Sequence, residues 1–223
     1  MSGEAPEPKT TEMGYPCLAL VTCGPQLEAA LAGPSLRVVS VVRLAGVAPR
    51  STLVLAAADL LVEDAGIAPD ALRTIVVSRG PGSFTGIRAG LATAAGLVAA
   101  AGAECHAYDS LLMQAARCDG EGTVWSAQPG RRGEVYTRAY RLQAEKPPQV
   151  EGEIEIVSVA SACERGPWAA AEALDLGGAE RAPVARGAAE ALLRLSAAGV
   201  APGPPEPIYV EGPPVHRRDG GGS

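Results

Sequence analysis

Side chains that commonly carry metal binding or catalysis are scarce in this chain. The 223 residues include two histidines, His106 and His216, which lie far apart in the sequence, and no further metal-type ligands cluster near either. A histidine-based zinc site needs several ligands at close spacing. No Gly-x-Ser-x-Gly elbow is present, and no cysteine lies in a recognisable nucleophile motif. The sequence therefore predicts no catalytic residues, no metal site and no cofactor site.

Cysteines and aromatic residues are also uninformative about catalysis. The five cysteines are an odd set without a C-x-x-C pair, which favours free buried thiols in a reducing compartment. One Phe, two Trp and five Tyr leave the core to Ala, Val and Leu. At 47% hydrophobic residues, the chain can fill one large domain or two lobes.

Positive charge is low, with a net charge of −6. Direct tight binding of nucleic acid is not expected, because an acidic surface repels phosphate groups and the sequence has only two basic doublets, Arg131-Arg132 and Arg217-Arg218. The first sixteen residues are polar and proline-rich and lack a signal-peptide pattern. The apolar stretch from Ala89 to Ala103 consists of small residues and is expected to be too short to cross a membrane. We expect a soluble, cytoplasmic protein without a membrane partner.

Hydrophobic patterns and turn residues predict a β-β-β-α-β-α order in the first half. The predicted strands and helices are 18–21, 27–31, 36–42, a helix over 51–65 with Ser51 as N-cap, strand 74–77 and a helix from 83 to 101. This order suits an actin/hexokinase-like (ribonuclease H-like) α/β fold with two lobes and mixed sheets flanked by helices, although the pattern alone also permits other α/β folds. The expected divisions are a disordered tail over 1–16, an N-terminal lobe with dimerisation helices over 17–105, a C-terminal lobe over 106–215 and a flexible tail over 216–223.

The second half is less regular. It predicts a strand at 103–107, a short helix at 111–116 after Asp109-Ser110, and a hairpin formed by 124–127 and 133–140. A strand near 154–159 and a helix at 188–195 ending at Gly199 follow, and Ile208-Tyr209-Val210 is expected to close the fold.

A glycine-rich turn joins strand 74–77 to the next helix. Gly80-Pro81-Gly82 forces the turn, and Ser83 is placed to cap the helix. The turn is not a P-loop, because no Lys-Ser/Thr follows at the required spacing. The G-x-G-x-x-x-G spacing and the missing N–H of Pro81 also exclude the dinucleotide-binding fingerprint. Three further glycines inside the helix would cost roughly 1 kcal/mol each relative to alanine, which predicts close packing on this helix.

The complete string Gly80-Pro-Gly-Ser-Phe-Thr-Gly-Ile-Arg88, followed by Gly90-Leu-Ala92, closely resembles the signature of the TsaB (YeaZ) family. Gly133-Glu-Val-Tyr136 is similar to the family's hairpin string, and the resemblance covers roughly residues 18–142. Members of this family are partners of TsaD in making threonylcarbamoyladenosine on tRNA. The resemblance implies a non-catalytic scaffold subunit that supports threonylcarbamoyl transfer to adenosine 37. It also implies that TsaD is the heterodimer partner, that the ATPase TsaE joins the larger assembly, and that the chain forms a homodimer when alone.

Two acidic positions of the related enzymes are replaced here. Where TsaB relatives typically have Asp-Thr-Ser, this chain has Val21-Thr22-Cys23, and Pro129 stands where an Asp usually precedes the Gly-Glu-Val-Tyr string. Because Mg²⁺ sites usually need carboxylates, kinase or ATPase activity is not expected. Pro49-Arg50-Ser51 also lacks the His that the family often has there.

We expect helices 51–65 and 83–101 to form half of the interface with TsaD, because the first is apolar nearly all round and the second is notched by glycines. The residues expected at or next to this interface are Leu53, Val54, Ala57, Leu61, Gly86, Gly90 and Ala94. Gly90→Trp is expected to abolish the complex while leaving the fold intact. Two alternatives remain open: a glycoprotease-like peptidase and a small-molecule kinase of the same fold.

Overall fold

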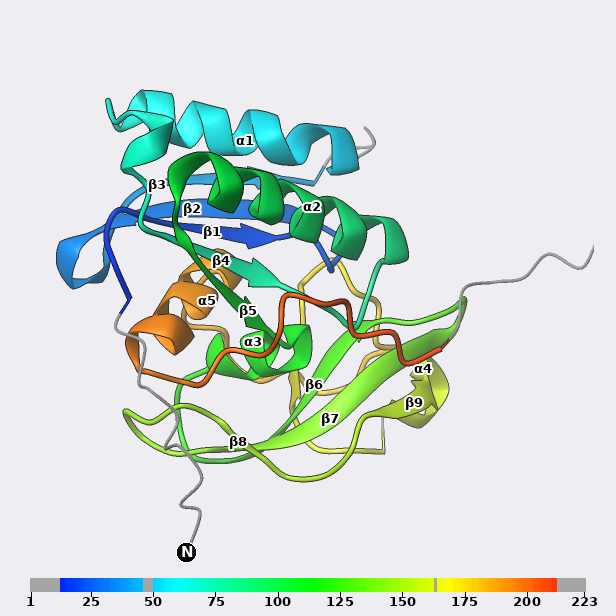
Figure 1. Ribbon diagram of the computed structural model, residues 1–223. Helices are drawn as coiled ribbons and strands as arrows, with labels where there is room; N and C mark the ends of the chain where they lie inside the picture. Colours follow the sequence, from blue (N-terminus) through cyan, green and yellow to red (C-terminus); the bar gives the residue numbers. More distant parts are fainter. Residues whose placement is uncertain (1–12, 46–49, 163, 212–223) are drawn as a thin grey trace, which may run out of the picture.

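The first of two sheets has five strands in the order β3-β2-β1-β4-β5 (Figure 1). The structure is a computed structural model and describes residues 13–45, 50–162 and 164–211. The first three strands pair antiparallel, whereas β4 and β5 run parallel to β1. The strands are β1 Cys17–Val21, β2 Leu27–Gly33, β3 Arg37–Leu44, β4 Thr74–Ser78 and β5 Glu104–Tyr108.

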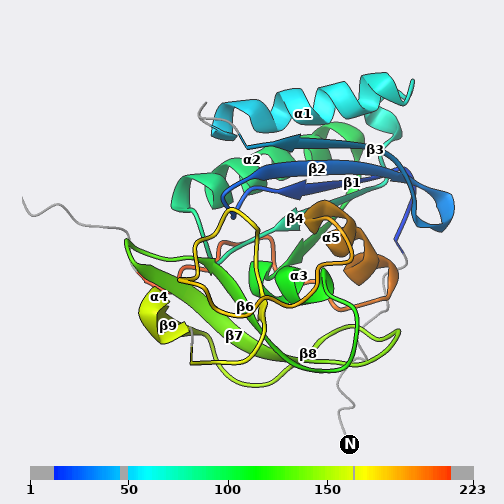
Figure 2. The same ribbon diagram turned by 180° about the vertical axis from the view of Figure 1, so that it is seen from behind.

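Helices cover both faces of this sheet, as Figures 1 and 2 show. On one face lie α1 (Arg50–Asp64) and α2 (Phe84–Ala101); on the other lie α3 (Ser110–Ala116) and α5 (Ala188–Ala197). The short 3-10 helices are Pro34–Leu36 and Pro69–Ala71.

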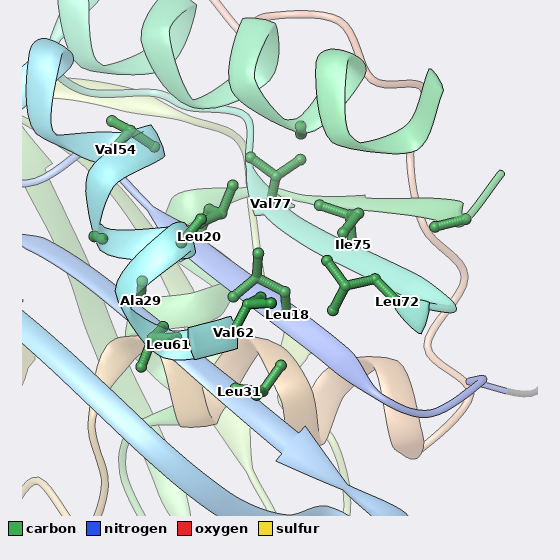
Figure 3. Packing of buried hydrophobic residues seen from close by; sticks show 14 of the residues in the cluster. Leu18, Leu20, Ala29, Leu31, Val54, Leu61, Val62, Leu72, Ile75 and Val77 are labelled. Carbon is green, nitrogen blue, oxygen red and sulfur yellow. The ribbon is translucent and has the colours of Figure 1, made fainter. Parts of the chain in front are cut away.

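The main core lies between the sheet and the α1–α2 pair. Aliphatic side chains of three strands meet those of α1 there (Figure 3), and they include Leu18, Leu20, Leu31, Val54, Leu61, Ile75 and Val77. A second cluster joins the opposite face of the sheet to α5 and α3. Both clusters consist largely of Ala, Val and Leu, as expected from the scarcity of aromatic residues.

The second sheet has the order β10-β6-β7-β8, and β9 also pairs with β7. It is centred on the hairpin of β6 (Gly122–Pro129) and β7 (Glu134–Leu142). The smaller elements are β8 Gln149–Val150, β9 Glu155–Ser158, α4 Val159–Ala162 and β10 Trp168–Ala169. Trp168 is fully buried in the core of this lobe.

The actin/hexokinase-like fold class and the order of the major elements are confirmed. Three details differ from the sequence-based predictions. Helix α1 begins at Arg50, so Ser51 lies inside the helix and is not its N-cap. The segment Ile208–Val210 is not a strand and belongs to neither sheet.

The third difference concerns the division into lobes. The boundary placed between residues 105 and 106 falls inside β5, because this strand pairs with β4 over its whole length. Helix α5 lies within the range 106–215 but packs on the first sheet. At the N-terminus, Met13 and Tyr15 of the expected tail pack against the second core cluster. Residues 1–12, Pro49, Cys163, His216 and Arg217-Arg218 lie outside the described residues.

Candidate partner-binding surface

The signature loop connects β4 to α2 and is anchored to the first hairpin. Ser83 is the N-cap of α2, as predicted, and its Oγ accepts a hydrogen bond from the Gly86 N–H at 3.2 Å. The Ser83 N–H donates to the Cys23 carbonyl at 2.8 Å. Helix α2 therefore starts directly beside the β1–β2 turn.

The glycines of α2 are explained by this proximity. A Cβ at Gly86 would overlap the Thr22 carbonyl oxygen, and one at Gly90 would overlap the Thr22 hydroxyl. At Gly96, by contrast, a Cβ would meet nothing within 4 Å. The close approach that two of the three glycines allow is therefore to the chain's own β1–β2 turn.

The predicted interface residues lie mainly beneath the surface of the helix pair. Val54, Ala57, Leu61 and Ala94 belong to the main core and are at most 3% exposed, and Gly90 is also buried. Leu53 and Gly86 are half-buried. The buried residues pack beneath the outer faces of α1 and α2. Of the predicted interface residues, Leu53 and Gly86 alone are partly accessible.

The outer face of α2 is largely apolar, whereas that of α1 combines the apolar Leu55, Ala56 and Leu60 with the acidic Asp59, Glu63 and Asp64. On α1, Leu55 and Leu60 are 52% and 55% exposed. The exposed residues of α2 are almost all small; they are Thr85, Arg88, Ala92, Ala95, Gly96, Ala99 and Ala100. We call these outer faces of α1 and α2, which lie side by side in Figures 1 and 2, the helix-pair surface. An exposed apolar surface of this kind is typical of a protein–protein contact.

Helix α2 is also long and apolar enough, by length and composition, to cross a bilayer, with a mean hydropathy of 1.4 over 18 residues. This helix is longer than the stretch from Ala89 to Ala103 on which the sequence-based expectation rests. Core helices of soluble proteins pass the same test. Ile87, Gly90 and Ala94 of α2 are buried in the molecule.

Neutral residues, Val21 and Pro129, stand where carboxylates would help to hold a metal–nucleotide in the related enzymes. Cys23 is fully buried, and its thiol donates to the Ser78 hydroxyl at 3.1 Å. Burial raises the pKa of this thiol to about 11, although the Ser78 hydrogen bond opposes the shift. Gln128, next to Pro129 in β6, is also buried, and its Nε2 donates a hydrogen bond to the Ser110 carbonyl at 3.3 Å. Among the described residues, no group of three or more His, Cys, Asp or Glu side chains could hold a metal ion.

The half-buried Asp109, which precedes α3, makes contacts that the sequence did not predict. Asp109 Oδ1 accepts from the Leu111 N–H at 2.7 Å, and its Oδ2 pairs with Arg138 at 3.3 Å. Burial raises the pKa of Asp109, while these two partners lower it. The pair joins the start of α3 to β7.

His106 has two polar partners that the sequence did not reveal. Its Nδ1 lies 2.6 Å from Ser196 Oγ, and its Nε2 lies 3.5 Å from Glu104. The serine is 2% exposed and the histidine 3% exposed. A nucleophile must reach its substrate, so this buried Ser–His–Glu contact does not support a peptidase site.

Comparisons with known proteins find relatives of this chain in sequence and in fold. The family model described as "TsaD: tRNA N6-adenosine threonylcarbamoyltransferase" matches residues 46–175. The tRNA threonylcarbamoyladenosine biosynthesis protein TsaB of Bacillus subtilis is 37% identical over 84 residues, which are 37% of each chain. An uncharacterized protein of Mycobacterium leprae is 42% identical over 78 residues, which are 35% of this chain and 21% of that protein. The alignments thus span well under half of either relative.

The solved structure of YeaZ from Pseudomonas aeruginosa has the same fold. It is 24% identical, with a TM-score of 0.64, and the match covers 87% of this chain and 99% of YeaZ. The family model covers more than half of the chain, and the signature loop, the TsaB relative and the YeaZ fold agree with it. The chain belongs to the TsaD family and, within it, is a TsaB (YeaZ) member.

Proposed function

We propose that this chain is a non-catalytic partner subunit that binds TsaD through the helix-pair surface and supports threonylcarbamoyl transfer to adenosine 37 of tRNA. The observation that carries the proposal is the exposure of Leu55 and Leu60 on α1, a helix that packs against α2, whose exposed residues are mostly alanine. Burying such side chains favours association by about 25 cal/mol per Å² of apolar area. Small residues on α2 allow a partner helix to approach closely.

The absence of carboxylates at two positions supports the proposal that this chain is not catalytic. Phosphoryl transfer from a nucleotide usually relies on Mg²⁺ held by carboxylates and phosphates. Here Val21 and Pro129 stand at the two positions, and the half-buried carboxylate of Asp109 is paired with Arg138. We expect the isolated chain not to bind Mg-ATP, whereas a kinase of this fold must bind it. Titration calorimetry with Mg-ATP separates the two functions.

The proposed assembly takes place in the cytoplasm. TsaE would join it through TsaD and this chain, and the isolated chain would form a homodimer through the same surface. A mass-resolved gel filtration of the isolated chain tests the homodimer. We expect the dimer to be replaced by a monomer in Leu60→Glu.

The decisive experiment measures binding to TsaD from the same cell. Leu55→Glu and Leu60→Glu place a charge where the proposal needs apolar contact, and each should weaken the complex by at least about tenfold. Val150→Glu is the matched control, because Val150 is 54% exposed in the second lobe. Equal effects of all three substitutions, or unchanged binding by both leucine variants, would refute the proposed surface.

A further inference from the structure

The last described residues cross from the first lobe to the second. We call residues 203–211 the strap. In Figure 1 the strap is the orange-to-red segment that runs from the region of α5 toward the β6–β7 hairpin. It contains no strand of either sheet, and its pairing with the first sheet is limited to an isolated bridge between Gly203 and Ala107 of β5.

Backbone hydrogen bonds fix the strap to the first lobe. The Gly203 N–H donates to the Ala107 carbonyl at 2.9 Å, and the Ile208 N–H donates to the Arg79 carbonyl at 2.8 Å. The signature loop makes room for this approach, since a Cβ at Gly80 would lie 2.7 Å from the Ile208 carbonyl oxygen. The first glycine of the signature loop is thus needed by a segment more than 120 positions later in the sequence.

Tyr209 joins the strap to α2. Its ring centroid is 5.0 Å from that of Phe84, and its hydroxyl accepts a hydrogen bond from Arg88 Nε at 3.0 Å. The Arg88 guanidinium also lies 3.9 Å from the Phe84 ring centroid. Arg88 is the only charged residue of α2 and is exposed on the helix-pair surface.

Glu211 joins the other end of the strap to the second lobe. Its Oε2 accepts from Arg131 Nε at 3.0 Å and from the Tyr136 hydroxyl at 3.2 Å. Arg131 follows the end of β6, and Tyr136 lies in β7. An open pocket of about 420 Å³ is lined by the signature loop, this hairpin and residues Ile208–Glu211.

The side-chain contacts at the two ends of the strap are expected to contribute little stability when the chain is alone, because they are exposed to solvent. The side chain of Arg131 is 57% exposed, and Tyr209 is 37% exposed. Exposed ion pairs contribute little, and a cation–π contact becomes stronger when solvent is removed from it. A partner that covers Arg88 and Tyr209 would therefore strengthen the hold of α2 on the strap.

We propose that the strap couples partner binding to the position of the second lobe. Docking on the helix-pair surface covers Arg88 and Tyr209, tightens the strap and, through Glu211, orders the turn between β6 and β7. This coupling rests on the proposed function, because it requires a partner on the helix-pair surface. The mechanical link within the isolated chain does not require one.

Hydrogen exchange on the full chain tests the link first. Tyr209→Ala removes the aromatic contact and the hydrogen bond to Arg88, and it should speed exchange of the Ile208 amide and of residues 130–134 by about tenfold. Glu206→Gln is the control within the strap, because Glu206 is exposed. Unchanged exchange at 130–134 in Tyr209→Ala would overturn the link, and so would an equal increase in the control.

The second measurement adds saturating TsaD. In the wild-type chain, exchange at residues 130–134 should slow. In Glu211→Ala, which removes the contacts of the strap with Arg131 and Tyr136 and leaves the helix-pair surface unchanged, this slowing should be lost although TsaD still binds. Slowing of equal size in both chains would overturn the coupling. Failure of the wild-type chain to bind TsaD would instead refute the proposed function, while the isolated-chain comparison would still decide whether the strap links the lobes.

Discussion

Gly90 of α2 lies directly against Thr22 in the β1–β2 turn, so that a β-carbon at position 90 would overlap the threonine hydroxyl. We predict that Gly90→Ala destabilises the fold by about 1–3 kcal/mol, because overpacking outweighs the better helix propensity of alanine. The midpoint of urea unfolding measures this loss. The expectation that Gly90→Trp leaves the fold intact is wrong for the same steric reason.

Gly96 provides the matched control in the same helix. A side chain there meets nothing within 4 Å, so Gly96→Ala should stabilise the chain by up to about 1 kcal/mol. If Gly90→Ala and Gly96→Ala shift the unfolding midpoint in the same direction, the contact with Thr22 does not explain the glycine at position 90.

The alanine face of α2 gives a second prediction about partner binding. Ala95 is exposed, so Ala95→Glu should change the stability of the isolated chain by less than about 0.5 kcal/mol. The same substitution should prevent a close helix contact and abolish co-purification with TsaD. Ala197→Glu places the same charge on an exposed position of α5 and should leave co-purification unchanged.

Glu28 caps α5 from a strand that precedes it by 161 positions. Its Oε1 accepts from the Ala189 N–H at 2.9 Å, and its Oε2 pairs with Arg43 at 3.1 Å. Glu28→Ala should cost about 1–2 kcal/mol in free energy of unfolding, because it removes a helix cap and leaves a buried N–H without a partner. Arg43→Ala should cost less, since Arg43 is 58% exposed. A larger loss in Arg43→Ala would show that the ion pair and not the cap matters.

The buried thiols predict a loss of stability at alkaline pH. Burial raises the pKa of Cys23 from 9.0 to about 11 and that of Cys17 from 9.0 to about 12. The folded state therefore retains these protons above pH 9, where the unfolded state releases them. Each thiol's contribution is complete below pH 9 and is lost above it at about 1.4 kcal/mol per pH unit, until the folded pKa is reached.

Urea unfolding at pH 8 and pH 10.5 measures this effect. The double variant Cys17→Ala/Cys23→Ala should lose less stability between these two pH values than the wild-type chain. An identical loss in both proteins would show that other groups cause the alkaline decrease.

The sequence predicted the first lobe well because its signals are local. The β-branched run Thr74–Val77 predicted a strand and Ser83 predicted the start of the next helix. The structure has β4 at Thr74–Ser78 and Ser83 as the N-cap of α2. The signature loop also led to the correct family. The start of α1 was misplaced by one residue because Ser51, a good capping residue, lies just inside the helix.

Contacts between distant segments could not be predicted in this way. Neither the capping of α5 by Glu28 nor the contact of Ile208 with Arg79 has a local pattern in the sequence. The same limit affected the interface residues. Apolar periodicity marks both the buried and the outer face of α1, and only the structure separates the buried Leu61 from the exposed Leu60.

Helix α5 packs on the first sheet although it is formed by residues 188–197. During synthesis from the N-terminus, one face of that sheet is therefore covered by only the short helix α3 until residues 188–197 have left the ribosome. Exposed apolar surface of this kind makes a nascent protein prone to aggregation. A fragment that stops after the second sheet should accordingly depend on chaperones, even though every strand of its first sheet is present.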